Sequence, residues 1–206
     1  MKSRKNFLIY LSVFALLIII ILALLFSGRK SEEDLITEEV DYTKNILKNS
    51  GFETGDFSFW KLEFQSDQTS YALIDNIVKF DGDYSLNITS DNDFKLYSVS
   101  QVIKSIPLDK KIIFNARIRT EDANAVFIQM KLFSSKDSLI VETRSDTLKG
   151  TNDWTFITTW LRTLNPDSYY LKVECCLAGK GRVWFDKLEV YPVDIKERSF
   201  FPIRIK

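Results

Sequence analysis

The stretch that decides the fold is Ile112–Arg119, which reads IIFNARIR. Its even-numbered positions carry apolar side chains and its odd-numbered positions carry mostly polar ones, namely Ile112, Phe114, Ala116 and Ile118 against Ile113, Asn115, Arg117 and Arg119. Because successive side chains of a β-strand point to opposite sides of the sheet, this alternation predicts a strand with one face in a core and one chemically mixed face.

The same pattern recurs along the chain, with apolar positions at Val126, Ile128, Met130 and Leu132 and again at Leu171, Val173 and Cys175. Ten runs rich in β-branched and aromatic residues are predicted to be strands: Trp60–Phe64, Tyr71–Phe80, Tyr84–Thr89, Leu96–Ile103, Lys111–Thr120, Ala125–Phe133, Ser138–Arg144, Trp154–Arg162, Tyr169–Leu177 and Arg182–Tyr191. Clusters of Gly, Asn, Asp and Ser separate them, and no long amphipathic helix pattern interrupts them. We therefore predict one all-β domain over residues 45–193, an antiparallel sandwich of two sheets.

The charge and the rare residues exclude several classes of function. After position 30 the chain has 23 basic and 28 acidic residues, a net charge of −5, which argues against nucleic acid as a partner. The absence of histidine removes the usual general base and the commonest zinc ligand. Cys175 and Cys176 are adjacent, so on a strand they would point to opposite faces, and we expect two thiols rather than a disulfide.

An uncharged apolar run, Phe7–Phe26, lies near the N-terminus. Its 20 residues span about 30 Å as a helix, the thickness of the hydrocarbon core of a bilayer. Basic residues precede it, so residues 1–6 are expected in the cytoplasm and the C-terminal domain on the extracytoplasmic side. We predict a transmembrane signal-anchor helix over residues 7–27 and a single-pass protein of the cell membrane. A cleaved signal peptide is the alternative, although no A-x-A-like site follows the run.

Two polar segments flank the predicted domain. Residues 28–44 are acidic and without periodicity, which is typical of a spacer that lifts a domain off the membrane. Residues 194–206 form a basic, aromatic tail that could contact the membrane or a partner, or could be a final strand or a free end.

A resemblance to a known family begins at residues 45–60, which read NILKNSGFETGDFSFW. Further matching pieces follow in order: DGDYSL at 81–86, Gln101, the strand at 112–120, Trp154, and VWFDKLEV at 183–190. Together they resemble carbohydrate-binding modules of families 4, 9 and 22. The resemblance implies a galactose-binding-like β-jelly roll of two antiparallel sheets, but it says less about the ligand, because this fold serves many functions.

The resemblance also implies a structural calcium where the first turn meets the closing strand. Glu53 matches the carboxylate of the turn and Asp186 that of the closing strand, with Asp81 or Asp83 nearby. Hard oxygen ligands from segments remote in sequence would hold the two ends of the sandwich together. The alternative is that Glu53 and Asp186 accept hydrogen bonds from backbone N–H groups at the turn.

Family members that bind polysaccharide do so across the concave sheet, with aromatic rings and polar side chains. The mixed strand faces offer such groups in Arg117, Phe127, Gln129, Tyr170, Lys172 and Glu174. The alternative for the charged ones is a solvated lattice of salt bridges. Trp60, Trp154 and Trp184 match positions that pack in or beside the core, Trp160 is ambiguous, and no run of exposed Trp or Tyr stands out.

These observations give three hypotheses about function. The first is a non-catalytic, membrane-anchored, extracytoplasmic module that binds a saccharide or glycan on its concave sheet. The second is a structural or protein-interaction domain of a cell-envelope complex that holds a protein partner. The third, an enzyme, is not favoured, because Glu53 and Asp186 suit a calcium site better and no other nucleophile or base is apparent.

Overall fold

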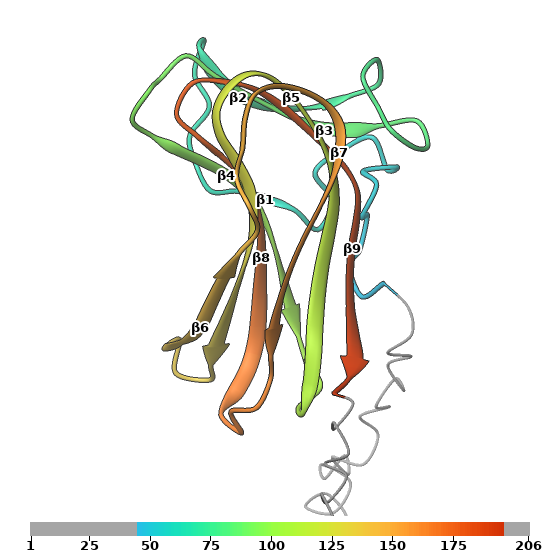
Figure 1. Cartoon of the computed structure of the whole chain (residues 1–206), viewed down its shortest axis with the longest axis vertical. Helices are drawn as coiled ribbons and strands as arrows, with labels where there is room; N and C mark the ends of the chain where they lie inside the picture. The colour runs from blue at the N-terminus through green and yellow to red at the C-terminus, as the bar shows by residue number, and fades with distance from the viewer. Residues whose placement is uncertain (1–44, 196–206) are drawn as a thin grey trace, which may run out of the picture. The chain divides into compact units, whose positions relative to one another are not determined.

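The computed structural model describes residues 45–195, and these form an all-β, sandwich-like domain (Figure 1). The strands are β1 (Lys61–Leu62), β2 (Ser70–Asp75), β3 (Ser85–Ser90), β4 (Leu96–Lys104), β5 (Lys110–Ser134), β6 (Leu139–Arg144), β7 (Leu148–Arg162), β8 (Ser168–Ala178) and β9 (Gly181–Asp194). The all-β class predicted from the sequence is confirmed.

All strand pairs are antiparallel and belong to one hydrogen-bonded network with the order β1-β4-β8-β5-β9-β3-β2, while β6 and β7 pair with β5 alone. The predicted sandwich of two sheets is therefore a sandwich of two halves that share one strand, β5. β5 takes part in both halves: residues 110–121 pair with β7 and β9, and residues 125–134 pair with β6 and β8.

The predicted strands at 111–120 and 125–133 are thus one long strand that arches over the end of the sandwich, as Figure 1 shows for β5 and its partner β7. Register shifts after Ile118 and Thr120 let β5 bend there, because an extra residue in one strand breaks the ladder and increases the local twist. At the same arch a Cβ on Gly181 would lie 2.4 Å from Ala123 Cα, so only glycine permits this approach of β9 to β5.

Other strand boundaries also differ from the prediction. β2 ends at Asp75, because the Asp75 carboxylate accepts hydrogen bonds from the N–H groups of Ile77 and Val78 and turns the chain. β7 begins at Leu148, before the predicted start at Trp154, because the segment between them continues to pair with the arch of β5.

One apolar core lies between the two halves. The side chains that alternate inward from β5 and β8 are fully buried in it, as predicted: Ile112, Phe114, Ala116, Ile118, Val126, Ile128, Met130, Leu132, Leu171, Val173 and Cys175. Because both halves of β5 direct their even-numbered residues into this core, their odd-numbered residues point away from it on opposite outer faces of the sandwich. Cys175 and Cys176 are free, buried thiols.

Within residues 45–195 no helix is long and apolar enough to cross a bilayer. The predicted cytoplasmic residues 1–6, transmembrane helix 7–27 and acidic spacer 28–44, and the tail from residue 196 on, lie outside the described residues.

Candidate functional site

The first candidate site is the outer face of the half formed by β6, the second part of β5, β8, β4 and β1, which we call the polar face. Its side chains are Phe127, Gln129, Lys131 and Phe133 of β5, Tyr170, Lys172 and Glu174 of β8, Ser100 of β4, and Glu63, which follows β1. Five of the six residues predicted to bind a ligand lie here. Arg117 does not, because it belongs to the first part of β5 and lies on the opposite outer face.

Glu174 is at the centre of the polar face, and its side chain is only 4% exposed. Its carboxylate accepts a hydrogen bond from Gln129 Nε2 at 2.7 Å and ion pairs from Lys131 Nζ at 2.8 Å and Lys172 Nζ at 3.1 Å. Lys172 also reaches Glu63 at 3.0 Å. Lys172 and Glu174 thus form ion pairs, as the alternative of a salt-bridge lattice expected, but Arg117 takes no part and the network is buried rather than solvated.

The network fixes the ionisation of its carboxylates. Burial by itself raises the pKa of Glu63, but hydrogen bonds from Ser100, Lys172 and Lys61 outweigh it and lower that pKa to about 2. Burial likewise raises the pKa of Glu174, and Lys131, Lys172 and Gln129 bring it below its usual value. Both groups are anionic at neutral pH, so the face presents fixed charges and hydrogen-bonding groups rather than a titrating acid or base.

One polar atom of this face lacks a partner. Gln129 Oε1 is buried and accepts no hydrogen bond from any described residue. A buried acceptor without a donor costs free energy, so a donor from a ligand or water would be favoured there.

Aromatic rings border the charged network at both ends. Phe133 and Tyr170 stack with ring centroids 4.9 Å apart and planes tilted by 13°. At the other end the Arg144 guanidinium lies 4.1 Å from the centroid of Phe127, which is 3% exposed and therefore offers little surface to a ligand. The polar face thus combines a partly accessible aromatic pair with a rigid set of donors and acceptors.

Sequence reasoning missed Glu63 and Ser100 in this network. Their hydrogen bond of 2.7 Å depends on the pairing of the two-residue strand β1 with β4, and no local pattern in the sequence encodes such a long-range contact.

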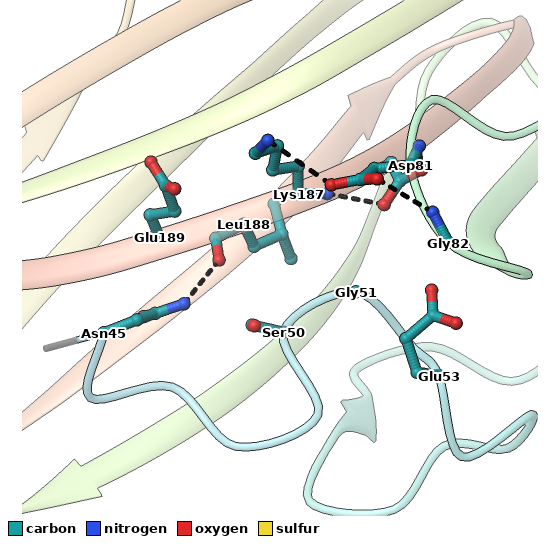
Figure 2. A pocket seen from close by; sticks show the side chains of 10 residues that line it. Asn45, Ser50, Gly51, Glu53, Asp81, Gly82, Lys187, Leu188 and Glu189 are labelled. Atoms are coloured by element: carbon teal, nitrogen blue, oxygen red, sulfur yellow. Dashed lines mark hydrogen bonds and ion pairs between the residues drawn. The ribbon is translucent and has the colours of Figure 1, made fainter.

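The second candidate site is a pocket of about 330 Å³ where the N-terminal turn meets β9 and the β2–β3 loop (Figure 2). Glu53, Asp81 and Asp186 line it, so the structure brings the predicted turn and closing-strand carboxylates together. Asp83 does not line the pocket: its side chain is 83% exposed and lies 3.9 Å from Lys79, and its backbone N–H donates a hydrogen bond to Glu53.

The carboxylates of this pocket already have partners. Asp186, 1% exposed, accepts hydrogen bonds from the backbone N–H groups of Phe80, Asp81 and Lys187, and Glu53 accepts one from Asp83. This is the arrangement that the sequence left as the alternative to calcium. Among residues 45–195 no three acidic, cysteine or histidine side chains cluster closely enough to hold a metal ion.

The electrostatics of the pocket still favour a cation. Burial raises the pKa of Asp186, and although three N–H groups oppose this, the nearby charge of Glu53 adds to the increase, so the net shift is upward. Lys187 pairs instead with Asp81 at 3.3 Å. Hard carboxylate oxygens of this kind, completed by backbone carbonyls and water, are the donors that calcium takes.

The tryptophans were predicted with mixed success. Trp60 is buried in the core as expected, and Trp184 is buried beneath Arg119 and Arg182. Trp154 is partly buried beside Phe80, whereas Trp160 is 49% exposed on the outer face of β7.

No family model matches the sequence, and no curated protein matches it either. Solved structures do match the fold. A CBM22-2 xylan-binding domain from Paenibacillus barcinonensis aligns over 70% of this chain and 98% of its own, with a TM-score of 0.53 and 10% identity. The chain has the fold of a CBM22 module. The fold-level resemblance predicted from the sequence is confirmed.

The same fold also occurs in enzymes. A cyclase from Fischerella sp. TAU aligns over 75% of this chain and 99% of its own, with a TM-score of 0.55 and 11% identity. The enzymatically active domain of tailspike protein 4 from bacteriophage CBA120 gives a TM-score of 0.62 at 11% identity, but this chain spans only 22% of it. At these identities the likeness shows the fold alone, so function has to come from the site.

Proposed function

We propose that this chain is a non-catalytic module that binds a saccharide across its polar face. The observation that carries the proposal is the buried, unpartnered acceptor Gln129 Oε1 beside a charged network that is already held in place. A sugar hydroxyl is a donor that satisfies such an acceptor, and pre-organised partners reduce the entropy cost of binding.

The aromatic pair supports the same proposal. The stacked rings of Phe133 and Tyr170 supply apolar surface next to the donors Lys131 and Lys172. Saccharides present apolar C–H faces as well as hydroxyl groups, so this mixture suits them better than it suits a purely apolar ligand. Xylan is the first ligand to test, because solved structures with this fold are xylan-binding domains.

Titration of the full-length protein with xylo-oligosaccharides, and with other neutral oligosaccharides in parallel, tests this function. We expect Gln129→Ala and Tyr170→Ala each to weaken binding by about tenfold, since each removes about 1–1.5 kcal/mol of contact. Lys136→Ala, in the exposed turn after β5, is the matched control and leaves binding unchanged.

Two results would contradict the proposal. One is indifference to every neutral saccharide tested. The other is a protein from solubilised membranes that binds this chain stoichiometrically, stays bound in excess sugar and no longer binds the Tyr170→Ala variant. That result would support the hypothesis of a protein-interaction domain of a cell-envelope complex instead.

The proposed function includes a membrane tether. The uncharged run Phe7–Phe26 and the basic residues before it support a single-pass anchor with the module on the extracytoplasmic side. Fractionation of cells followed by carbonate extraction tests it. Release of a fragment that begins near residue 28 would instead support a cleaved signal peptide.

A structural calcium at the Glu53–Asp186 pocket is a further part of the proposal. Its support is the pair of neighbouring carboxylates, one of them buried, neither of which forms an ion pair within residues 45–195, since Lys187 pairs with Asp81. Calcium would raise the unfolding temperature, and EDTA would lower it, because an ion that binds only the folded state stabilises it. Glu53→Gln should abolish the difference between calcium and EDTA, and a wild-type protein that unfolds identically in both would remove calcium from the proposal.

A further inference from the structure

A second set of exposed aromatic side chains lies on the outer face opposite the polar face. We call it the aromatic track: Trp154, Phe156 and Trp160 of β7, Lys111 and Arg117 of β5, and Phe80 of the β2–β3 loop. Phe156 and Trp160 are each 49% exposed and Phe80 is 40% exposed. The sequence showed no run of exposed tryptophan or tyrosine. In the structure, Trp154, Phe156 and Trp160 share the outer face of β7, because they are two and four residues apart along the strand.

The cations of the aromatic track stack on rings instead of pairing with carboxylates. The Arg117 guanidinium lies 4.9 Å from the centroid of Phe80 and 5.1 Å from that of Phe156, and Lys111 Nζ lies 4.5 Å from that of Trp160. Neither cation forms an ion pair with any residue between 45 and 195. By contrast, Arg119 and Arg182 on the same face both contact Glu121 at 3.6 Å.

Stacking fixes a guanidinium while leaving its N–H edge free to donate. Arg117 therefore presents a pre-organised fork of N–H donors that forms no ion pair within residues 45–195. Such a fork matches the two oxygens of a carboxylate.

We propose that the aromatic track binds an anionic saccharide, a chain of uronic acid units, at a site separate from the polar face. Phe156 and Trp160 supply platforms for sugar faces, while Arg117 beside Phe156 and Lys111 beside Trp160 bind carboxylates of the chain. Phe156 and Trp160 are four residues apart on one strand, about 13 Å. An oligomer is therefore needed to reach both.

The shape of the aromatic track favours a soluble saccharide over a lipid surface as the occupant. The aromatic side chains of β7 lie along a strand in the sheet rather than at the tip of a loop. They could insert into a bilayer only if the whole outer face of the sheet contacted the lipid.

Titration of the full-length protein with oligogalacturonate tests the proposal, with xylo-oligosaccharide and anionic lipid vesicles as separate arms. Arg117→Gln and Trp160→Ala should each weaken oligogalacturonate binding by about tenfold or more, since a charge-assisted hydrogen bond contributes about 1.5–3 kcal/mol. Arg117→Lys should retain part of the affinity. Arg144→Gln is the matched control, because it removes a ring-stacked arginine from the opposite face and should leave oligogalacturonate binding unchanged.

The proposal is overturned if Arg117→Gln binds oligogalacturonate as tightly as the wild type, or if Arg144→Gln loses as much affinity. Binding of vesicles but not of oligogalacturonate, lost in both track variants, would assign the track to lipid instead. Failure at the polar face is distinguishable, because Tyr170→Ala and the xylo-oligosaccharide arm report on that face alone.

Discussion

Replacing Glu174 by glutamine removes the charge at the centre of the polar face while keeping the size of the side chain. The carboxylate holds Lys131 at 2.8 Å, Lys172 at 3.1 Å and the Gln129 amide at 2.7 Å, and it is almost completely buried. The amide of the new glutamine keeps one acceptor oxygen. Its NH2 group is a donor and would face a lysine ammonium group or the NH2 group of Gln129, which are donors as well. The substitution therefore weakens several contacts at once.

The expected loss follows from these contacts. A hydrogen bond to a charged group contributes about 1.5–3 kcal/mol, and losing one partner of a buried pair costs about 3–5 kcal/mol. Lys131 and Lys172 are 24% and 22% exposed, so both can turn partly into water, and Lys172 keeps Glu63. We expect Glu174→Gln to lower the free energy of unfolding by about 2–3 kcal/mol, which moves a urea midpoint by roughly 1 M.

Urea unfolding followed by tryptophan fluorescence measures this change. Glu142→Gln is the control, since Glu142 lies opposite Lys131 on β6 but is exposed and forms no ion pair within residues 45–195. Its effect should stay within about 0.5 kcal/mol. The reasoning is refuted if Glu174→Gln unfolds at the wild-type midpoint, or if the two variants lose equal stability.

Three further outcomes are expected. Acidification should destabilise the domain between about pH 4.5 and 2, because the folded pKa of Glu63 is lowered from 4.5 to about 2. The full shift corresponds to about 3–4 kcal/mol, and solvent screening leaves roughly half of it. Glu63→Gln should flatten this part of the pH profile. Gly82→Ala should lower the free energy of unfolding by about 2 kcal/mol, because its φ is 65° and the new Cβ would lie 2.2 Å from Glu53 Oε1 and displace that side chain. Gly150→Ala, with a φ of 71° and open space around it, should cost about half as much. Equal losses of stability in thermal unfolding would contradict the contact with Glu53. Burial raises the pKa of both cysteine thiols, so Ellman's reagent should react with them only after unfolding, whereas rapid reaction of the native protein would contradict their burial.

The strands and the core could be predicted because their signal is local. Alternation with a period of two assigns each of Ile112, Phe114, Ile128 and Val173 to a face without any knowledge of the neighbouring strand, and all four are fully buried. The predicted strands Tyr169–Leu177 and Arg182–Tyr191 likewise agree within one residue with the end of β8 at Ala178 and the start of β9 at Gly181.

The candidate sites were less predictable, because they depend on which faces meet in space. Arg117 and Gln129 lie in two predicted strands, 111–120 and 125–133, and sequence reasoning offered the mixed faces of both as one ligand-binding surface. Only the arch of β5 separates them onto opposite sides of the sandwich. In the same way, the ion pair of Glu63 with Lys172 joins residues far apart in sequence.

The sequence by itself therefore determined an all-β domain, the residues of its core, the polar identity of the outward positions and the apolar run before the domain. These depend on periodicity, composition and length, which are local properties of the chain. Tertiary structure alone decided that the outward residues form two unlike surfaces, one a buried charge network and one a track of stacked rings and cations. The physical reason is that charge pairing and ring stacking depend on distances between strands, and the bends in β5 and β7 set those distances.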